Sequence, residues 1–163
     1  MVILKARYRT TAAQAKDTIR YIAFRSGRDG RRTARQLFDE LGNLSKEQVY
    51  QIIDQEAAHG KRFFYHVVLS PDPVGEDTFN DLHLRSVAQD AISHLAKQSG
   101  YALSWAGAVH DDHTNKRHLH LLAIVPKRLD REALDCSRGS HPGMSAAAAG
   151  TGSGTSSRAG AAA

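Results

Sequence analysis

The segment AGAVHDDHTNKRHLHLLAIVP, residues 106–126, contains four histidines, and three of them lie in or at the end of its apolar stretches: His110, His118 and His120. His118 and His120 are two positions apart in a segment that continues as an apolar run, and alternate residues of a β-strand project from the same face. A strand rises about 3.3 Å per residue, so their Cα atoms would lie roughly 6 to 7 Å apart. Two imidazoles can close that span onto one metal ion held at about 2.1 Å.

The third histidine comes from a predicted neighbouring strand. His110 ends the apolar stretch 102–109, and the polar segment 111–116 would turn the chain back so that His110 lies beside His118. Three protein ligands leave positions open for water or substrate, which is the arrangement of a catalytic metal rather than a structural one. Asp112 could accept the second imidazole N–H of a ligand histidine and fix its tautomer, so it is predicted to belong to the site.

The sequence leaves the third ligand and the metal open. His113 lies in the polar loop and could replace His110 as a ligand, or it could be solvated. A structural alternative is that the HLH motif is only a polar interruption at a strand end. An unpaired buried imidazole would be costly, which favours the metal site. Three imidazoles suit Zn²⁺, Mn²⁺, Co²⁺ or Ni²⁺ better than Mg²⁺.

Length and composition limit the classes of protein. A chain of 163 residues can form one domain with a sizeable core, and its formal net charge of +5 suggests a polyanionic partner, with nucleic acid as the first candidate. No apolar stretch approaches the roughly 20 residues that span a bilayer, and the start MVILKARYR lacks the apolar core of a secretory signal. A soluble, cytoplasmic protein without membrane insertion is therefore expected. The single cysteine, Cys136, excludes an intramolecular disulfide.

A tyrosine on the first predicted helix is the candidate nucleophile. Thr11 and Gln14 form a capping box, and the helix that they open carries one apolar stripe, made by Ala12, Ala15, Ile19, Ile22 and Ala23. Tyr21 falls about 200° around the helix from Ile19, nearly opposite that stripe, so its hydroxyl is not committed to the core. The simpler alternative is a tyrosine on the helix flank with its ring against a neighbouring loop.

A basic segment follows this tyrosine and is predicted to bind phosphates. Its cations are interleaved with glycine and aspartate, and they are Arg25, Arg28, Arg31, Arg32 and Arg35. Guanidinium groups bind phosphates through paired hydrogen bonds, although such a loop could also be a solvated surface. Further cations flank the histidine segment and are expected to add basic charge next to the site: Lys116, Arg117, Lys127 and Arg128.

The remaining pattern predicts an α+β fold, with helices packed against a mostly antiparallel sheet. Strands are expected over residues 2–8 and 63–69. His66 within the second strand is assigned a structural role, with a contribution of this strand end to the site as the alternative. Ser45 and Gln48 form a second capping box that opens a helix. The longest helix is expected over residues 79–99, and two adjacent strands with the histidines follow it.

The C-terminal part differs in composition from the rest of the chain. Residues 1–134 carry the regular patterns and are predicted to form one domain. Residues 135–163 are dominated by alanine, glycine and serine without periodicity, which predicts a disordered tail.

Three motifs resemble those of the HUH endonucleases, in the relaxase branch that includes plasmid mobilisation proteins. HDDHTNKRHLH resembles the three-histidine motif, RYIAFRSG resembles the nucleophile motif, and FFYHVVLSPDP resembles the strand conserved between them. The resemblance covers roughly residues 1–134. A tyrosine that precedes the histidines is typical of a relaxase rather than of single-tyrosine transposases.

The resemblance implies a relaxase nuclease fold and a defined reaction. Tyr21 would attack a phosphate in single-stranded DNA at the transfer origin of a plasmid or integrative element, with Asp112 as a further catalytic residue. The strand would be left joined to the enzyme as a 5′-phosphotyrosine. The resemblance also implies Mn²⁺ or Mg²⁺ as the metal, while Zn²⁺ or another transition ion stays open. Expected partners are relaxosome accessory proteins and the coupling protein of a type IV secretion system.

Three alternatives stay open at this point. The chain could be a rolling-circle replication initiator of the same superfamily, or a non-catalytic module that binds single-stranded nucleic acid. The nucleophile could also be a different tyrosine, with Tyr8 as the first substitute and Tyr50, Tyr65 and Tyr101 behind it.

Overall fold

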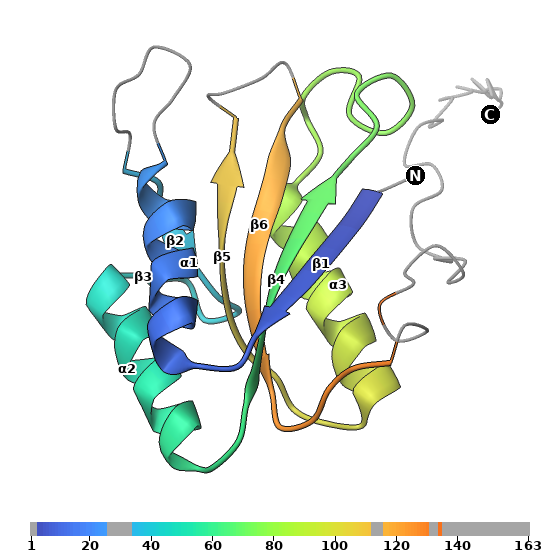
Figure 1. Ribbon diagram of the computed structural model, residues 1–163. Helices are drawn as coiled ribbons and strands as arrows, with labels where there is room; N and C mark the ends of the chain where they lie inside the picture. The colour runs from blue at the N-terminus through green and yellow to red at the C-terminus, as the bar shows by residue number, and fades with distance from the viewer. Residues whose placement is uncertain (1–2, 26–33, 112–115, 131–133, 135–163) are drawn as a thin grey trace, which may run out of the picture.

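The described residues form a six-stranded antiparallel sheet with three helices, which confirms the predicted α+β class (Figure 1). The computed structural model describes residues 3–25, 34–111, 116–130 and 134. Along the chain the elements are β1 (Ile3–Arg9), α1 (Ala12–Phe24), β2 (Leu37–Phe38), β3 (Asn43–Leu44), α2 (Lys46–Ala58), β4 (Phe63–Ser70), α3 (Leu84–Ser99), β5 (Ser104–His110) and β6 (His118–Val125).

The sheet is covered on both faces. Its strand order is β1-β4-β6-β5-β2-β3, and Figure 1 shows α1 and α2 on one side of the sheet with α3 on the other. Ile19, Ile22 and Ile53 pack against one face, whereas Leu84 and Leu95 pack against the opposite face. The central strand β6 is buried along nearly its whole length, as its apolar composition on both faces predicts.

Side-chain caps start the first two helices where the sequence predicts. The Thr11 hydroxyl accepts a hydrogen bond from the backbone N–H of Gln14 at 3.3 Å. At α2 the capping box is complete, because Ser45 and Gln48 each accept from the other's backbone N–H. These contacts satisfy backbone donors that the first turn of a helix leaves without an intrahelical partner.

The predicted start of the longest helix, at residue 79, is wrong. Helix α3 begins at Leu84, and Phe79 lies in an irregular segment with 84% of its surface exposed. Asn80 has a φ of 55°, which a right-handed helix does not accommodate. The Asp77 carboxylate accepts from the backbone N–H of Leu82 and holds this segment in its non-helical shape.

The strand register places the histidines on the face covered by α1. His110 on β5 lies directly opposite His118 on β6, and His120 lies opposite Ala108. On the other side of β6, Val68 of β4 lies opposite His120. Within the described residues, none of the helices combines the length and the apolar character needed to cross a bilayer.

Candidate metal centre

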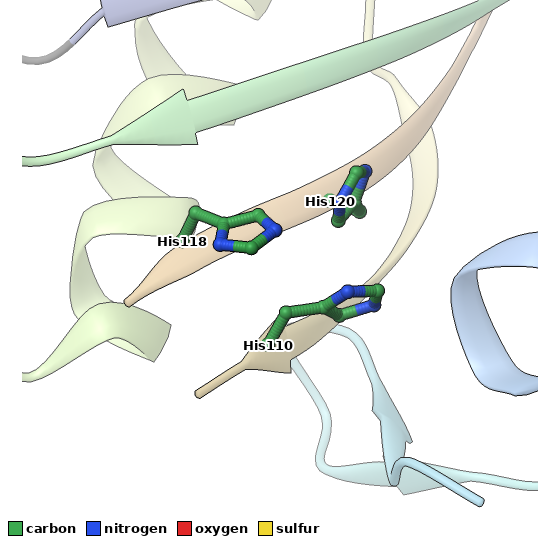
Figure 2. A group of neighbouring side chains, drawn as sticks. All are labelled: His110, His118 and His120. Atoms are coloured by element: carbon green, nitrogen blue, oxygen red, sulfur yellow. The ribbon is translucent and has the colours of Figure 1, made fainter. Parts of the chain in front are cut away.

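The three predicted histidines come together at one end of the β5–β6 pair (Figure 2). His110, His118 and His120 each offer one ring nitrogen, and these nitrogens all lie within 4.8 Å of one another. The ring centroids of His110 and His120 are 4.3 Å apart, and those of His118 and His120 are 5.0 Å apart. His110 and His120 are buried and His118 is half-buried, and the group could hold a metal ion.

Backbone carbonyls fix the tautomers of two of these imidazoles. His110 Nε2 lies 2.8 Å from the carbonyl oxygen of Ile22, and His118 Nδ1 lies 3.1 Å from the carbonyl oxygen of Lys116. A carbonyl oxygen can only accept, so each of these nitrogens carries the proton. A neutral imidazole then has an unprotonated nitrogen on its other side, which is the form that binds a metal.

The third imidazole is tied to another histidine. His120 Nδ1 lies 2.8 Å from Nε2 of His66 on β4. The other nitrogen, His120 Nε2, is buried and has no hydrogen-bond partner among the described residues. Buried polar atoms in proteins are nearly always paired, so this nitrogen fits a metal ligand. The donor set therefore suits a divalent ion that accepts imidazole ligands.

Burial keeps the central imidazole neutral. Desolvation by burial is the largest cause, and together with the neighbouring His110, His66 and His118 it lowers the pKa of His120 to about 2. Burial also lowers the pKa of His66, with contributions from Arg9 and Arg7. A neutral ring is the ligand form, so no proton has to leave His120 before a metal binds near neutral pH.

His66 is the site residue that the sequence pattern does not reveal. Its alternation with Phe64 and Val68 indicates only a histidine within a half-buried strand. The register between β4 and β6 brings it beside His120, with the two rings stacked at 5.0 Å between centroids. A long-range strand pairing of this kind has no signal in a single sequence, so its role as the hydrogen-bond partner of a ligand is visible only in the fold.

Tyr21 lies at the edge of the histidine group. Its ring centroid is 5.8 Å from that of His120 and 6.1 Å from that of His66, and 43% of its surface is exposed. Its hydroxyl oxygen accepts a hydrogen bond of 2.8 Å from Arg25 Nη1. The next residue, Ile22, is buried and its carbonyl holds His110, so α1 is fixed to the cluster right beside the tyrosine. The flank of α1 opposite its buried stripe thus reaches the site.

The substitute tyrosines lie elsewhere, and all of them are described. The rings of Tyr8 and Tyr65 are tilted against each other, with centroids 5.5 Å apart, on the sheet face covered by α3. Tyr65 accepts from the backbone N–H of Leu129, and Tyr50 donates to the carbonyl of Lys16. Tyr101 follows the end of α3. Of the five tyrosines, Tyr21 is the one whose ring contacts the histidine group.

Several predicted residues lie outside the described residues, namely Arg28, Arg31, Arg32, Asp112 and His113. Arg25 is described and bonds to the tyrosine oxygen. Arg35 donates from its backbone to Ala23 and from its side chain to the carbonyl of Arg25, so it braces the end of α1. Lys116 is exposed next to His118.

The four cations predicted to flank the histidine segment lie at the two ends of β6, with Lys116 and Arg117 before the strand and Lys127 and Arg128 after it. Arg117 is used within the protein, because it pairs with Asp77 at 3.3 Å and donates to the carbonyls of Asn80 and Leu82. The expectation that Lys127 and Arg128 lie next to the histidines is wrong. Strand β6 runs away from the site for eight residues, which carries them to the opposite end of the sheet, where Arg128 lies over the Tyr8 ring.

Comparison with known proteins gives no family for this chain. No protein-family model, curated protein or solved structure matches it.

The chemistry of the site follows from its parts: three imidazoles that could hold one cation, a half-exposed phenol, and a guanidinium on the phenol oxygen. Such a set can hold an anionic ester beside an oxygen nucleophile.

Proposed function

We propose that this chain is a metal-dependent DNA-nicking enzyme, a relaxase of the HUH endonuclease type with the corresponding nuclease fold. One observation carries the proposal: the Tyr21 ring lies 5.8 Å from the ring of His120, beside three imidazoles able to share an ion. The motif resemblance of the sequence and its basic charge support the same function.

The histidines would hold the metal and the tyrosine would perform the transfer. His110, His118 and His120 would bind Mn²⁺ or Mg²⁺, with Zn²⁺ or another transition ion as the alternative that the imidazole set also suits. A divalent ion in this position supplies Lewis-acid polarisation of a phosphate and stabilises the charge that builds up on it. Burial excludes water from His110 and His120, which strengthens electrostatic interactions at the site.

The reaction exchanges one phosphate ester for another. Tyr21 Oη forms a bond to the scissile phosphorus while the bond from phosphorus to the 3′-oxygen of the preceding nucleotide breaks. The phenol proton passes to solvent and the leaving 3′-oxygen takes one up, so the products are a 3′-hydroxyl and a 5′-phosphotyrosine. The Arg25 guanidinium stabilises Oη as it loses its proton, because a charged donor binds an oxygen anion more strongly than a neutral oxygen. No bond is hydrolysed, so the reverse reaction reseals the strand.

The biological setting belongs to the same proposal. The substrate would be single-stranded DNA at the transfer origin of a plasmid or integrative element, met in the cytoplasm. Relaxosome accessory proteins and the coupling protein of a type IV secretion system would be the partners.

The experiment is covalent capture of single-stranded DNA from the transfer origin of the element that encodes the chain, with Mn²⁺ present. We expect the wild-type protein to give an adduct that survives detergent and Tyr21→Phe to give none. Tyr8→Phe is the matched control, since Tyr8 lies on the opposite sheet face, and it should retain the adduct. An adduct in Tyr21→Phe would remove Tyr21 from the role. DNA binding without an adduct in any protein would indicate a non-catalytic binding module.

A further inference from the structure

A groove runs beside Tyr21 between β1 and α1, on the sheet face that carries the histidines. It has a volume of about 620 Å³. Its walls are polar on both sides, and they include Arg7 and Arg9 of β1, Gln14, Thr18 and Tyr21 of α1, and His66 of β4. His66 is hydrogen-bonded to His120, so one end of the groove reaches the candidate metal centre.

Three cations follow one another along β1: Arg7 and Arg9 line the groove, and Lys5 continues their row along the strand. Lys5, Arg7 and Arg9 are alternate residues of the strand, so their side chains project from one face, the face of His66 to which Arg7 is paired. All three are exposed, and their side chains make no hydrogen bond or ion pair within the part of the chain that the structure describes. β1 is an edge strand, so no other described strand lies on the outer side of this row.

The opposite wall does not neutralise this charge. Among the described residues that line the groove, the one carboxylate is Asp17, and it is paired with Arg20 of the same helix. Arg7 and Arg9 line the same groove as His66, and Arg7 is paired with His66 across the two strands, so their charge lies beside the site. A groove of this kind concentrates anions close to the histidines.

The spacing of the cations fits an extended polyanion. Alternate strand residues are about 6.6 Å apart, close to the separation of successive phosphates in an extended polynucleotide strand. A single row on one edge strand matches one sugar-phosphate backbone, whereas a duplex presents two. Exposed cations of this kind hold nucleic acid through its phosphates, without reading its sequence.

We propose that this β1–α1 groove binds the backbone of single-stranded DNA adjoining the phosphate that reacts, with Lys5, Arg7 and Arg9 each neutralising one phosphate. The inference rests on the proposed nicking function, and it adds a binding surface on β1 to the basic segment that follows Tyr21. The groove leads the strand past Tyr21 and His66, so the DNA arrives at the metal centre from the open edge of the sheet.

The test uses the salt dependence of binding. Fluorescein-labelled oligothymidylate is titrated with Tyr21→Phe protein, which blocks covalent capture, and affinity is measured by anisotropy over a range of salt concentrations. Each phosphate contact to a single strand contributes about 0.7 to the slope of log affinity against log salt. The double variant Arg7→Gln/Arg9→Gln should lower this slope by about 1.4. When the salt concentration falls from 1 M to 0.1 M, the affinity of the double variant should therefore rise roughly 25-fold less than that of the parent protein.

A charge-matched control separates the groove from general attraction. Lys61→Gln/Lys97→Gln removes two exposed cations away from the groove and should keep the parent slope. Thermal melting of both double variants checks that the fold is intact. An unchanged slope in Arg7→Gln/Arg9→Gln, an equal loss in the control, or no binding by the parent protein would overturn the groove. An equal loss of slope with duplex DNA would overturn its assignment to a single strand.

The outcomes also separate this inference from the proposed function. Loss of slope in the groove variant, together with no adduct in a protein that retains Tyr21, would leave the groove standing and refute nicking. An adduct formed by the protein that retains Tyr21, together with an unchanged slope in the groove variant, would support nicking and refute the groove.

Discussion

Removal of the His66 imidazole should weaken metal binding without removing any ligand. When a metal occupies His120 Nε2, the proton of that ring must sit on Nδ1 and donate to His66 Nε2, 2.8 Å away. His120 is 4% exposed, so bulk water does not replace the lost acceptor. A buried donor left unsatisfied costs about 1–3 kcal/mol, or roughly 5- to 150-fold in affinity. Loss of such a partner typically costs 10- to 100-fold in metal affinity, so we expect His66→Ala to fall in that range.

The assay is calorimetric titration with Co²⁺, whose visible absorption also reports the coordination of the ion. His66→Gln should recover much of the affinity, because its amide oxygen can accept from Nδ1. His94→Ala, on α3 away from the site, is the matched control and should bind as the wild type does. Wild-type affinity in His66→Ala would refute the reasoning, as would a His66→Gln protein that binds no better than His66→Ala.

Three further predictions concern stability and rate. Gly107→Ala should lower the free energy of unfolding by about 1–3 kcal/mol in a urea titration, because the new Cβ would lie 2.5 Å from Leu121 Cδ2; unchanged stability would contradict this packing. Metal-free protein should lose stability on acidification, because the pKa of His120 is lowered to about 2 in the folded state, so the unfolded chain binds the proton first. The full stability should be present above pH about 6.5 and should fall by about 1.4 kcal/mol per pH unit below it, as measured by urea unfolding with chelator; a flat profile between pH 6.5 and 5 would contradict the burial of this ring. Arg25→Gln should slow adduct formation about 10-fold in a single-turnover assay while Arg25→Lys slows it less, and equal rates in both variants and the wild type would exclude a role for this group at Tyr21.

The local parts of the site were predictable from the sequence. His118 and His120 share a face because alternation within a strand is a local rule, and His110 joins them because a hairpin pairs neighbouring segments. Helix caps are also local: the predicted capping box is complete at α2, whereas at α1 the structure shows the Thr11 side-chain cap alone. These features depend on residues close together in the chain.

The parts that depend on distant pairing were not predictable. His66 joins the site only through the register of β4 against β6, and Arg7 lines a groove only because β1 is an edge strand. The start of α3 was predicted too early because Asp77 and Asn80 hold a competing local structure. Arg128 was placed near the histidines by its distance in sequence, whereas an extended strand separates residues rapidly in space.

Metal stoichiometry tests the central claim most directly, because every chemical step requires the three histidines to share one ion. Equilibrium dialysis against Co²⁺ should give one tightly bound ion per wild-type chain. His110→Ala, His118→Ala and His120→Ala should each lose it, while His94→Ala keeps it. A wild-type chain that binds no ion, or single variants that bind as tightly as the wild type, would contradict the account.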